Sequence, residues 1–180
     1  MIHKWCLVTG TSSGIGHTLA KLLLERDWEV VGVARRETGI DHPHYHHLQL
    51  DLGDPVRLTE AFDDTIAREH QLDARARVGL VNNAALLGPV GPLEALPFAE
   101  LQMAFTVNTL APLWLMGYFH RQRPSNTLRI VNVSSGAAYN ARAGWMAYCS
   151  TKAALLMGGQ VLGTEAEGYE TAGFSPDRGV

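Results

Sequence analysis

A tyrosine and a lysine four positions apart are the side chains of this sequence most suited to proton transfer. Tyr148 and Lys152 lie in an apolar, alanine-rich run, residues 144–157, that is typical of a helix. Positions i and i+4 of a helix share one face, so the phenol and the ammonium should project side by side. A nearby cation lowers the pKa of a phenol from its reference value of about 10. Such a pair can exchange a proton with a ligand, although the same spacing also occurs on helices without a chemical role.

A glycine-rich turn near the N-terminus predicts a phosphate-binding site. The apolar strand 5–9 leads into Gly10-Thr11-Ser12-Ser13-Gly14-Ile15-Gly16, and residues 19–26 have helical periodicity. Glycines let the backbone come close to a phosphate, and the helix N-terminus offers free N–H groups and a positive dipole end. The spacing differs from the G-x-G-x-x-G of the commonest dinucleotide fingerprint, so a plain turn is the alternative.

The end of the second predicted strand, residues 28–33, indicates which dinucleotide is preferred. A site for NAD places an acidic residue there to bind the ribose hydroxyls, whereas this sequence has Ala34 followed by Arg35 and Arg36. A planar guanidinium matches the geometry of phosphate, which suits the 2′-phosphate of NADP. We therefore expect NADP(H) to be preferred over NAD(H), with a solvated pair of surface charges as the alternative.

Three more strands and two helices are predicted along the chain. The strands comprise residues 46–50, 78–81 and 128–133, and the helices comprise residues 54–70 and 98–121. Asp54 and Pro55 supply the N-cap and the first position of one helix. Pro112 predicts a kink or break just before it in the other helix, which would place Asn108 beside irregular backbone. The last strand is apolar enough for a central parallel strand, buried on both faces.

Small and polar residues follow the last two of these strands. In the segment Asn82-Asn83-Ala84-Ala85, the alanines would let a flat ring lie against the backbone, and the asparagines can fix the strand end. Ser134 and Ser135 stand at the carboxyl end of the last strand, where open α/β sheets bind ligands. A loop or capping role is the alternative for either serine.

Composition narrows the classes of function. The chain has 180 residues, 46% of them hydrophobic, and a formal net charge of −3. This suits one globular domain over residues 1–180 and gives no reason to expect nucleic acid or an anionic membrane as a partner. No apolar run reaches the ~20 residues of a membrane helix, and no signal-peptide pattern is present. Cys6 and Cys149 suit a reducing compartment, so we expect a cytoplasmic protein.

Four histidines within residues 42–47 raise the alternative of a metal site. Apart from Asp41 and Asp51, no cysteine or carboxylate stands at ligand spacing from them. We therefore expect no metal site, and we interpret the segment as a solvent-facing loop that enters the third strand.

Taken together, these motifs resemble the short-chain dehydrogenase/reductase family. The resemblance extends from Thr9 to Lys152, and Ser135 and Asn108 precede Tyr148 by 13 and 40 positions, as in the family pattern. The segment 135–138, with residues 144–149, is more particularly similar to sepiapterin reductase and benzil reductase types. The resemblance implies a Rossmann-type doubly wound α/β fold with a parallel sheet of strand order 3-2-1-4-5.

The resemblance also implies hydride transfer between a nicotinamide and a carbonyl or alcohol substrate. Tyr148 would be the general acid when a ketone is reduced and the base in the reverse direction. Lys152 would lower the pKa of Tyr148 and bind the nicotinamide ribose. Ser135 would hold the substrate oxygen, and Asn108 would hold a water in a proton relay behind Lys152. The residues that would contact the cofactor are Gly10, Ser12, Ser13, Gly14, Ile15, Gly16, Arg35, Arg36, Asp51, Leu52, Asn82, Asn83, Ala84, Ala85, Tyr148 and Lys152.

The sequence departs from the family pattern in two places. NADP-using members often have a basic residue in the glycine-rich turn, where this chain has Ser12 and Ser13, so the preference for NADP depends on Arg35 and Arg36. After Thr164, where members continue with a sixth and a seventh strand, this chain has a polar segment. We expect both strands to be lacking, which makes the domain incomplete and leaves the fifth strand as an open apolar edge.

Because the domain is expected to be incomplete, an inactive nucleotide-binding fragment or a subunit-association module is the alternative to an enzyme. Members commonly associate through the helices that carry the counterparts of Asn108 and Tyr148, so we expect a homodimer or a homotetramer.

Overall fold

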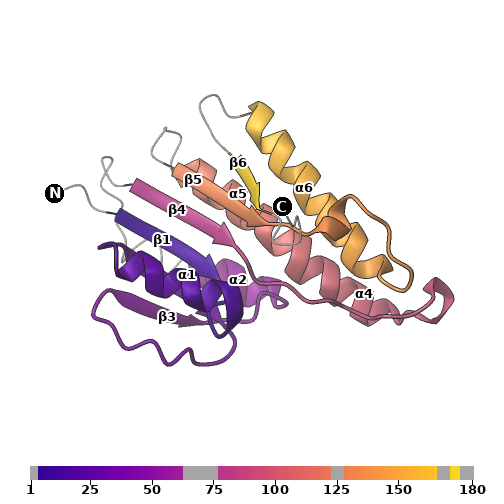
Figure 1. Ribbon diagram of the computed structural model, residues 1–180, viewed down its shortest axis with the longest axis horizontal. Helices are drawn as coiled ribbons and strands as arrows, with labels where there is room; N and C mark the ends of the chain where they lie inside the picture. The colour runs from indigo at the N-terminus through magenta and orange to yellow at the C-terminus, as the bar shows by residue number, and fades with distance from the viewer. Residues whose placement is uncertain (1–3, 63–76, 123–127, 166–170, 175–180) are drawn as a thin grey trace.

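A computed structural model describes residues 4–62, 77–122, 128–165 and 171–174 (Figure 1). The helices and strands, in chain order, are β1 (Lys4–Thr9), α1 (Gly14–Leu24), β2 (Glu29–Ala34), β3 (Tyr45–Gln49), α2 (Pro55–Ala61), β4 (Arg77–Asn82), η2 (Leu93–Ala95), α4 (Phe98–Phe105), η3 (Thr106–Leu110), α5 (Ala111–Gln122), β5 (Leu128–Val133), η4 (Gly136–Ala138), α6 (Met146–Glu165) and β6 (Thr171–Phe174). The strands form one sheet of order β3-β2-β1-β4-β5-β6 in which every pair is parallel. The predicted α/β fold with the strand order 3-2-1-4-5 is thereby confirmed.

The strand β6 corrects the prediction that the fifth strand is an open edge. It pairs with β5 in parallel, from Ile130 opposite Thr171 to Val133 opposite Phe174. A short edge strand is held by backbone hydrogen bonds, and a four-residue run with a threonine and a glycine has too little apolar periodicity to be recognised in a sequence. The sixth strand is therefore present, whereas the described residues include no seventh.

Helices cover both faces of the sheet (Figure 1). Alternate residues of β1 point to opposite sides, so Cys6 and Val8 pack with Ala20 and Leu24 of α1. Trp5 and Leu7 join the larger core on the other side, which includes side chains of α2, α5 and α6. This arrangement buries the central strands on both faces, as their apolar sequences predict.

The described residues cover the α1 face of the sheet only in part. An apolar groove of about 930 Å³ lies between α1 and β5, with Leu19 and Leu23 on one side and Val81, Val131 and Val133 on the other. No helix in the described part of the chain is long and apolar enough to cross a membrane.

The predicted break before Pro112 is confirmed. A π-helical turn, η3, separates α4 from α5, and the backbone N–H of Ala111 donates to the carbonyl oxygen of Thr106, five residues earlier. Proline has no N–H to donate, so the regular helical bonding cannot run through this point. Asn108 lies inside the π-helical turn, a feature that is frequent at functional sites.

The predicted N-terminus of α2 is also confirmed. The side chain of Asp54 accepts hydrogen bonds from the backbone N–H groups of Val56 and Arg57, and Pro55 occupies the first helical position. Residues 63–70 of the predicted helix lie outside the described residues.

Candidate active site

Two glycines at the junction of β1 and α1 permit close backbone packing. Gly10 has a φ of +78°, and a Cβ on it would lie 2.7 Å from Nδ2 of Asn83. A Cβ on Gly16, in the first turn of α1, would collide with the carbonyl oxygen of Gly10. The side chain of Ser13, which precedes α1, makes no capping hydrogen bond. The first N–H groups of α1 therefore keep their capacity to bind an anion.

Thr9 and Asn83 join this turn to the end of β4. Oγ1 of Thr9 accepts hydrogen bonds from the backbone N–H groups of Asn83 and Ala84, each at 3.0 Å. In return, Nδ2 of Asn83 donates to the carbonyl oxygens of Thr9 at 2.8 Å and Gly10 at 3.3 Å. The two neighbouring strand ends are thus held in one arrangement, as predicted for an asparagine that follows a strand.

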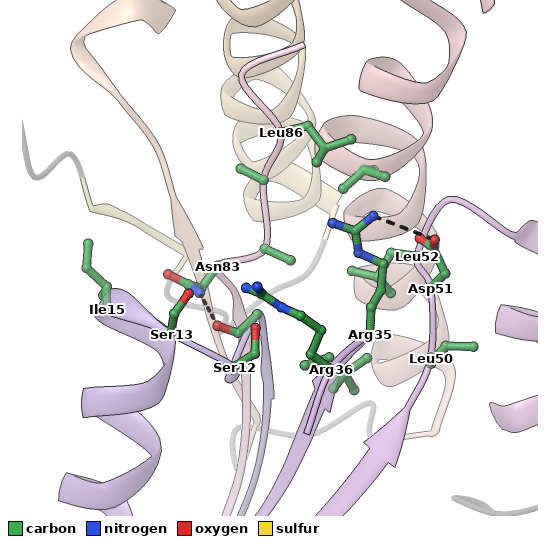
Figure 2. A pocket seen from close by; sticks show the side chains of 16 residues that line it. Ser12, Ser13, Ile15, Arg35, Arg36, Leu50, Asp51, Leu52, Asn83 and Leu86 are labelled. Atoms are coloured by element: carbon green, nitrogen blue, oxygen red, sulfur yellow. Dashed lines mark hydrogen bonds and ion pairs between the residues drawn. The ribbon is translucent and has the colours of Figure 1, made fainter. Parts of the chain in front are cut away.

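A pocket of about 320 Å³ opens at the ends of β1, β2, β3 and β4 (Figure 2). This volume is within the range of about 300–1,000 Å³ typical of ligand pockets. The predicted cofactor residues that line it are Gly10, Ser12, Ser13, Ile15, Arg35, Arg36, Asp51, Leu52, Asn83, Ala84 and Ala85. The pocket therefore brings together residues that come from four separate parts of the sequence, at the carboxyl edge of the sheet.

The two arginines of the pocket have different surroundings. Arg35 turns toward Asp51, with 3.9 Å between Nη1 and Oδ2, and both side chains are largely exposed (Figure 2). Oδ1 of Asp51 accepts a hydrogen bond from the backbone N–H of Gly53 at 2.8 Å. Arg36 extends over the pocket in the direction of Ser12 in this view (Figure 2). The guanidinium of Arg36 forms no ion pair with a described residue, which leaves it available to an anionic ligand.

Asn82, which was also predicted to contact the cofactor, does not line this pocket. Its side chain is buried, and its Nδ2 donates to Oδ1 of Asn132 on β5 at 2.8 Å. Gly16 packs against the carbonyl oxygen of Gly10 and Nδ2 of Asn83, outside the pocket. Gly14 borders the apolar groove on the α1 face. Tyr148 and Lys152, both on α6, do not line the pocket either.

Several residues of the pocket wall were not predicted. They are Val33, Ala34, Leu50, Leu86 and Val107. The first four lie at or beyond the end of a strand. The predicted strand ends could therefore have identified them as candidates for the pocket wall. Val107 comes from the π-helical turn, and only the tertiary structure brings it to the pocket.

Tyr148 and Lys152 are paired on α6 as their spacing predicts. Nζ of Lys152 lies 5.7 Å from the centre of the Tyr148 ring, and Trp145 packs its ring edge-to-face against the same tyrosine at 5.8 Å. The lysine is only 2% exposed, and its Nζ donates to the carbonyl oxygen of Val133 at 2.7 Å. Burial lowers the pKa of Lys152 to about 8, because a charged group loses its hydration there. At neutral pH the group is still an ammonium, held at the end of β5.

Ser135 lies at the same end of β5, where η4 begins. Its Oγ accepts a hydrogen bond from the backbone N–H of Ala137 at 3.2 Å, so it caps this short helix. The cap turns the chain toward α6, which packs against η4. Ser134 is also buried, but it comes one position earlier in the extended chain. The serine predicted to bind substrate is thus close along the backbone to Val133, which binds Lys152.

Asn108 ties the π-helical turn to two other segments. Its Oδ1 accepts from the backbone N–H of Leu86, and its Nδ2 donates to the carbonyl oxygen of Leu86, both at 2.7 Å. Nδ2 also donates to Oγ1 of Thr151, beside Lys152, at 3.1 Å. The side-chain amide is therefore engaged with protein groups, and it links the pocket wall to the helix that carries Tyr148.

Histidines of the segment 42–47 do not gather around a common point. His42 accepts a hydrogen bond from the backbone N–H of His44, and His46 pairs with Glu29 at 3.2 Å. Within the described ranges, no group of three or more His, Cys, Asp or Glu side chains is arranged to hold a metal ion.

Comparison with known proteins identifies the family of this chain. The model of the short chain dehydrogenase family matches residues 4–171. The chain is 33% identical over 168 residues to a benzil reductase ((S)-benzoin forming) of Bacillus subtilis, covering 91% of this chain and 68% of the relative. It is 30% identical over 192 residues to a sepiapterin reductase of Xenopus laevis, covering 95% and 72%.

A solved structure gives the same result. The crystal structure of a short-chain dehydrogenase/reductase from Burkholderia vietnamiensis superposes with a TM-score of 0.88 at 32% identity, covering 97% of this chain and 83% of the other. The parallel sheet described above agrees with this match. The chain therefore belongs to the short-chain dehydrogenase family of oxidoreductases.

Proposed function

We propose that this chain is an NADP(H)-preferring oxidoreductase that transfers a hydride between the nicotinamide and a carbonyl or alcohol substrate. The observation that carries the proposal is the buried ammonium of Lys152, 5.7 Å from the Tyr148 ring at the end of β5. Burying this ammonium costs hydration free energy. Charged groups in such unfavourable surroundings are common at functional sites.

The residues of the pocket fit a dinucleotide phosphate. Gly10, Ser12 and Ser13 of the turn line the pocket, and the N-terminus of α1 adds the positive end of its dipole. Arg36 suits the 2′-phosphate, while Asp51 and Leu52 border the place for the adenine. When bound, the nicotinamide supplies or accepts the hydride.

The proton moves through Tyr148. As a carbonyl group is reduced, the phenol donates its proton to the developing oxyanion, and in alcohol oxidation the phenolate removes it. Lys152 stabilises the phenolate by its charge. Ser135 donates a hydrogen bond to the substrate oxygen, which keeps this oxygen near the phenol. The side-chain amide of Asn108 is engaged with Leu86 and Thr151, so its role in this proposal is to hold the π-helical turn against the helix that carries Lys152.

A Tyr148→Phe substitution tests the chemical step. We expect NADPH-dependent reduction of aromatic diketones to fall by a factor of about 100 or more, because general acid catalysis contributes about 10²–10⁴. NADPH binding, measured by calorimetry, should remain. The control is Tyr139→Phe, since this tyrosine is 53% exposed and has Ala143 in place of a lysine four positions later. Turnover that survives Tyr148→Phe would refute the mechanism.

An Arg36→Ala substitution tests the preference for NADP. Hydrogen bonds to a charged group contribute about 1.5–3 kcal/mol, so the Kd for NADPH should rise about 10- to 100-fold while the Kd for NADH changes little. Arg57→Ala, on the exposed surface of α2, removes the same charge away from the pocket and is the matched control. Equal weakening of NADPH and NADH by Arg36→Ala would refute the assignment.

The alternative function is nucleotide binding without turnover. The chain covers 68% of the length of the two Bacillus benzil reductases, and the described residues leave an apolar groove beside α1 on the β5 face. This alternative predicts that NADPH binds and that no carbonyl substrate is reduced at any concentration. Measurable turnover by the wild-type chain would exclude it.

We also propose that the chain forms a homodimer or homotetramer through the side of α6 that adjoins η3 and α5. Leu110, Met157 and Val161 are large apolar side chains with 45–59% of their surface exposed on these elements. Light scattering of the purified chain tests this association, and Met157→Glu should shift the molar mass toward the monomer. A monomeric wild-type chain would contradict the proposal.

A further inference from the structure

The side chain of Tyr45 reaches from the edge strand β3 to the glycine-rich turn. Tyr45 pairs with Val30 of β2 and lies near the beginning of β3, several residues from the carboxyl edge of the sheet. Its hydroxyl nevertheless donates a hydrogen bond to Oγ1 of Thr11 at 3.1 Å. The Thr11 side chain is fully buried, so this contact is made behind the turn and not in the pocket.

The path of the Tyr45 ring depends on Gly32. A Cβ on Gly32 would collide with the hydroxyl of Tyr45 and would lie 2.7 Å from Oγ1 of Thr11. Every other residue of β2 has a side chain, and a glycine inside a strand often marks a close approach of another group. The glycine is therefore explained by the passage of the tyrosine across β2.

A second contact restrains Thr11 through its backbone. The carbonyl oxygen of Thr11 lies 3.2 Å from Nδ1 of His17 on α1. A carbonyl can only accept a hydrogen bond, so this contact requires the proton of the ring to be on Nδ1. Thr11 is thus held by its side chain and by its backbone, while the next residues, Ser12 and Ser13, face the pocket.

We propose that Tyr45 is a positioning residue of the cofactor site. Through Thr11, its hydroxyl keeps the glycine-rich turn in the conformation in which the N–H groups of the turn and of α1 can bind the pyrophosphate of the dinucleotide. A turn that is already ordered loses less conformational entropy when the ligand binds. This inference rests on the proposed binding of NADP(H), but it concerns residues that do not touch the cofactor.

The test compares two ligands on a Tyr45→Phe variant, which loses only the hydroxyl. NADPH contains a pyrophosphate, whereas adenosine 2′-monophosphate carries the adenine and the 2′-phosphate without it. We expect the Kd for NADPH to rise about three- to tenfold, as for the loss of one hydrogen bond, and the Kd for adenosine 2′-monophosphate to stay within twofold. An unchanged Kd for NADPH, or an equal rise for both ligands, would overturn the inference.

Variants of Thr11 provide the control. Thr11→Val removes the acceptor and should reproduce the effect of Tyr45→Phe, whereas Thr11→Ser keeps the hydroxyl and should bind NADPH like the wild type. Combining Tyr45→Phe with Thr11→Val should add nothing to either substitution alone, because both remove the same hydrogen bond. Additive effects would mean that the two side chains act independently, against the inference.

A measurement without ligand separates this inference from the proposed function. Amide hydrogen exchange of residues 11–14 should be about threefold faster or more in Tyr45→Phe than in the wild type, with exchange in β4 unchanged. If the exchange difference is present but the wild-type protein binds neither ligand, the proposed function is refuted and the role of Tyr45 is not. Equal exchange in the two proteins would refute the role of Tyr45 whatever the ligands do.

Discussion

Replacing Lys152 with methionine removes a buried charge and keeps most of the side-chain volume. In the folded chain, burial lowers the pKa of Lys152 from 10.5 to about 8. At about 1.4 kcal/mol for each pH unit between the two pKa values, the wild-type protein loses about 3 kcal/mol of stability at neutral pH to keep this ammonium buried. Lys152→Met removes that cost but leaves the carbonyl oxygen of Val133 without its donor, which costs about 1–3 kcal/mol. We therefore expect the variant to be about as stable as the wild type at pH 7, or more stable.

The dependence on pH is the sharper part of this prediction. The folded state releases the lysine proton near pH 8 and the unfolded state near pH 10.5, so the unfolded state binds more protons between these values. The free energy of unfolding of the wild type therefore gains a contribution from Lys152 that rises with pH in this window. Relative to the variant, the wild type should gain about 2.5 kcal/mol between pH 7 and pH 10.

Urea denaturation followed by tryptophan fluorescence, at pH 7, 8, 9 and 10, measures this difference. The two proteins share every other titrating group, including Cys6, whose pKa burial raises to about 12, so those contributions cancel in the comparison. Activity provides a second readout, because Lys152→Met should lose turnover even where it is the more stable protein. Parallel stability profiles across the pH range would refute the assignment of a buried, titrating ammonium to Lys152.

Three further predictions concern stability and reactivity. Asp54→Ala should lower the free energy of unfolding by about 1 kcal/mol in urea, whereas Asp54→Asn, which can still cap α2, should not. Asn108→Leu should cost about 2–4 kcal/mol in the same assay, because two backbone groups of Leu86 lose their partner; a cost below 1 kcal/mol would contradict this. A thiol reagent at pH 8 should label Cys149 in the native chain and Cys6 only after unfolding, and rapid labelling of both would show that Cys6 is not buried.

Much of the fold could be predicted because its signals are local. The apolar runs of the strands, the cap at Asp54 and the break before Pro112 each depend on residues within one turn or one strand. The family pattern then supplied the strand order, which no local signal contains. β6 was missed because its stability comes from pairing with β5 and not from its own four residues.

Part of the candidate site could be predicted because its signals are also local. The residues of the glycine-rich turn, Arg35 and Arg36 lie at the ends of elements that the sequence identifies, and the structure brings them to one pocket. Asn82 and Asn83 could not be told apart, since both follow the same apolar run. In the fold, one is buried against Asn132, and the other binds the turn.

The sequence alone shows which chemical groups are present and which of them are neighbours on one helix or in one turn. The spacing of Tyr148 and Lys152 makes them adjacent on any helix, and the glycines allow a close turn in any fold. The folded chain adds what no local pattern contains: Lys152 is buried against Val133, Asn108 binds Leu86, and Tyr45 crosses β2 to reach Thr11. These contacts join segments that are far apart in sequence, and they depend on the sheet register and helix packing, which arise from the folding of the whole chain.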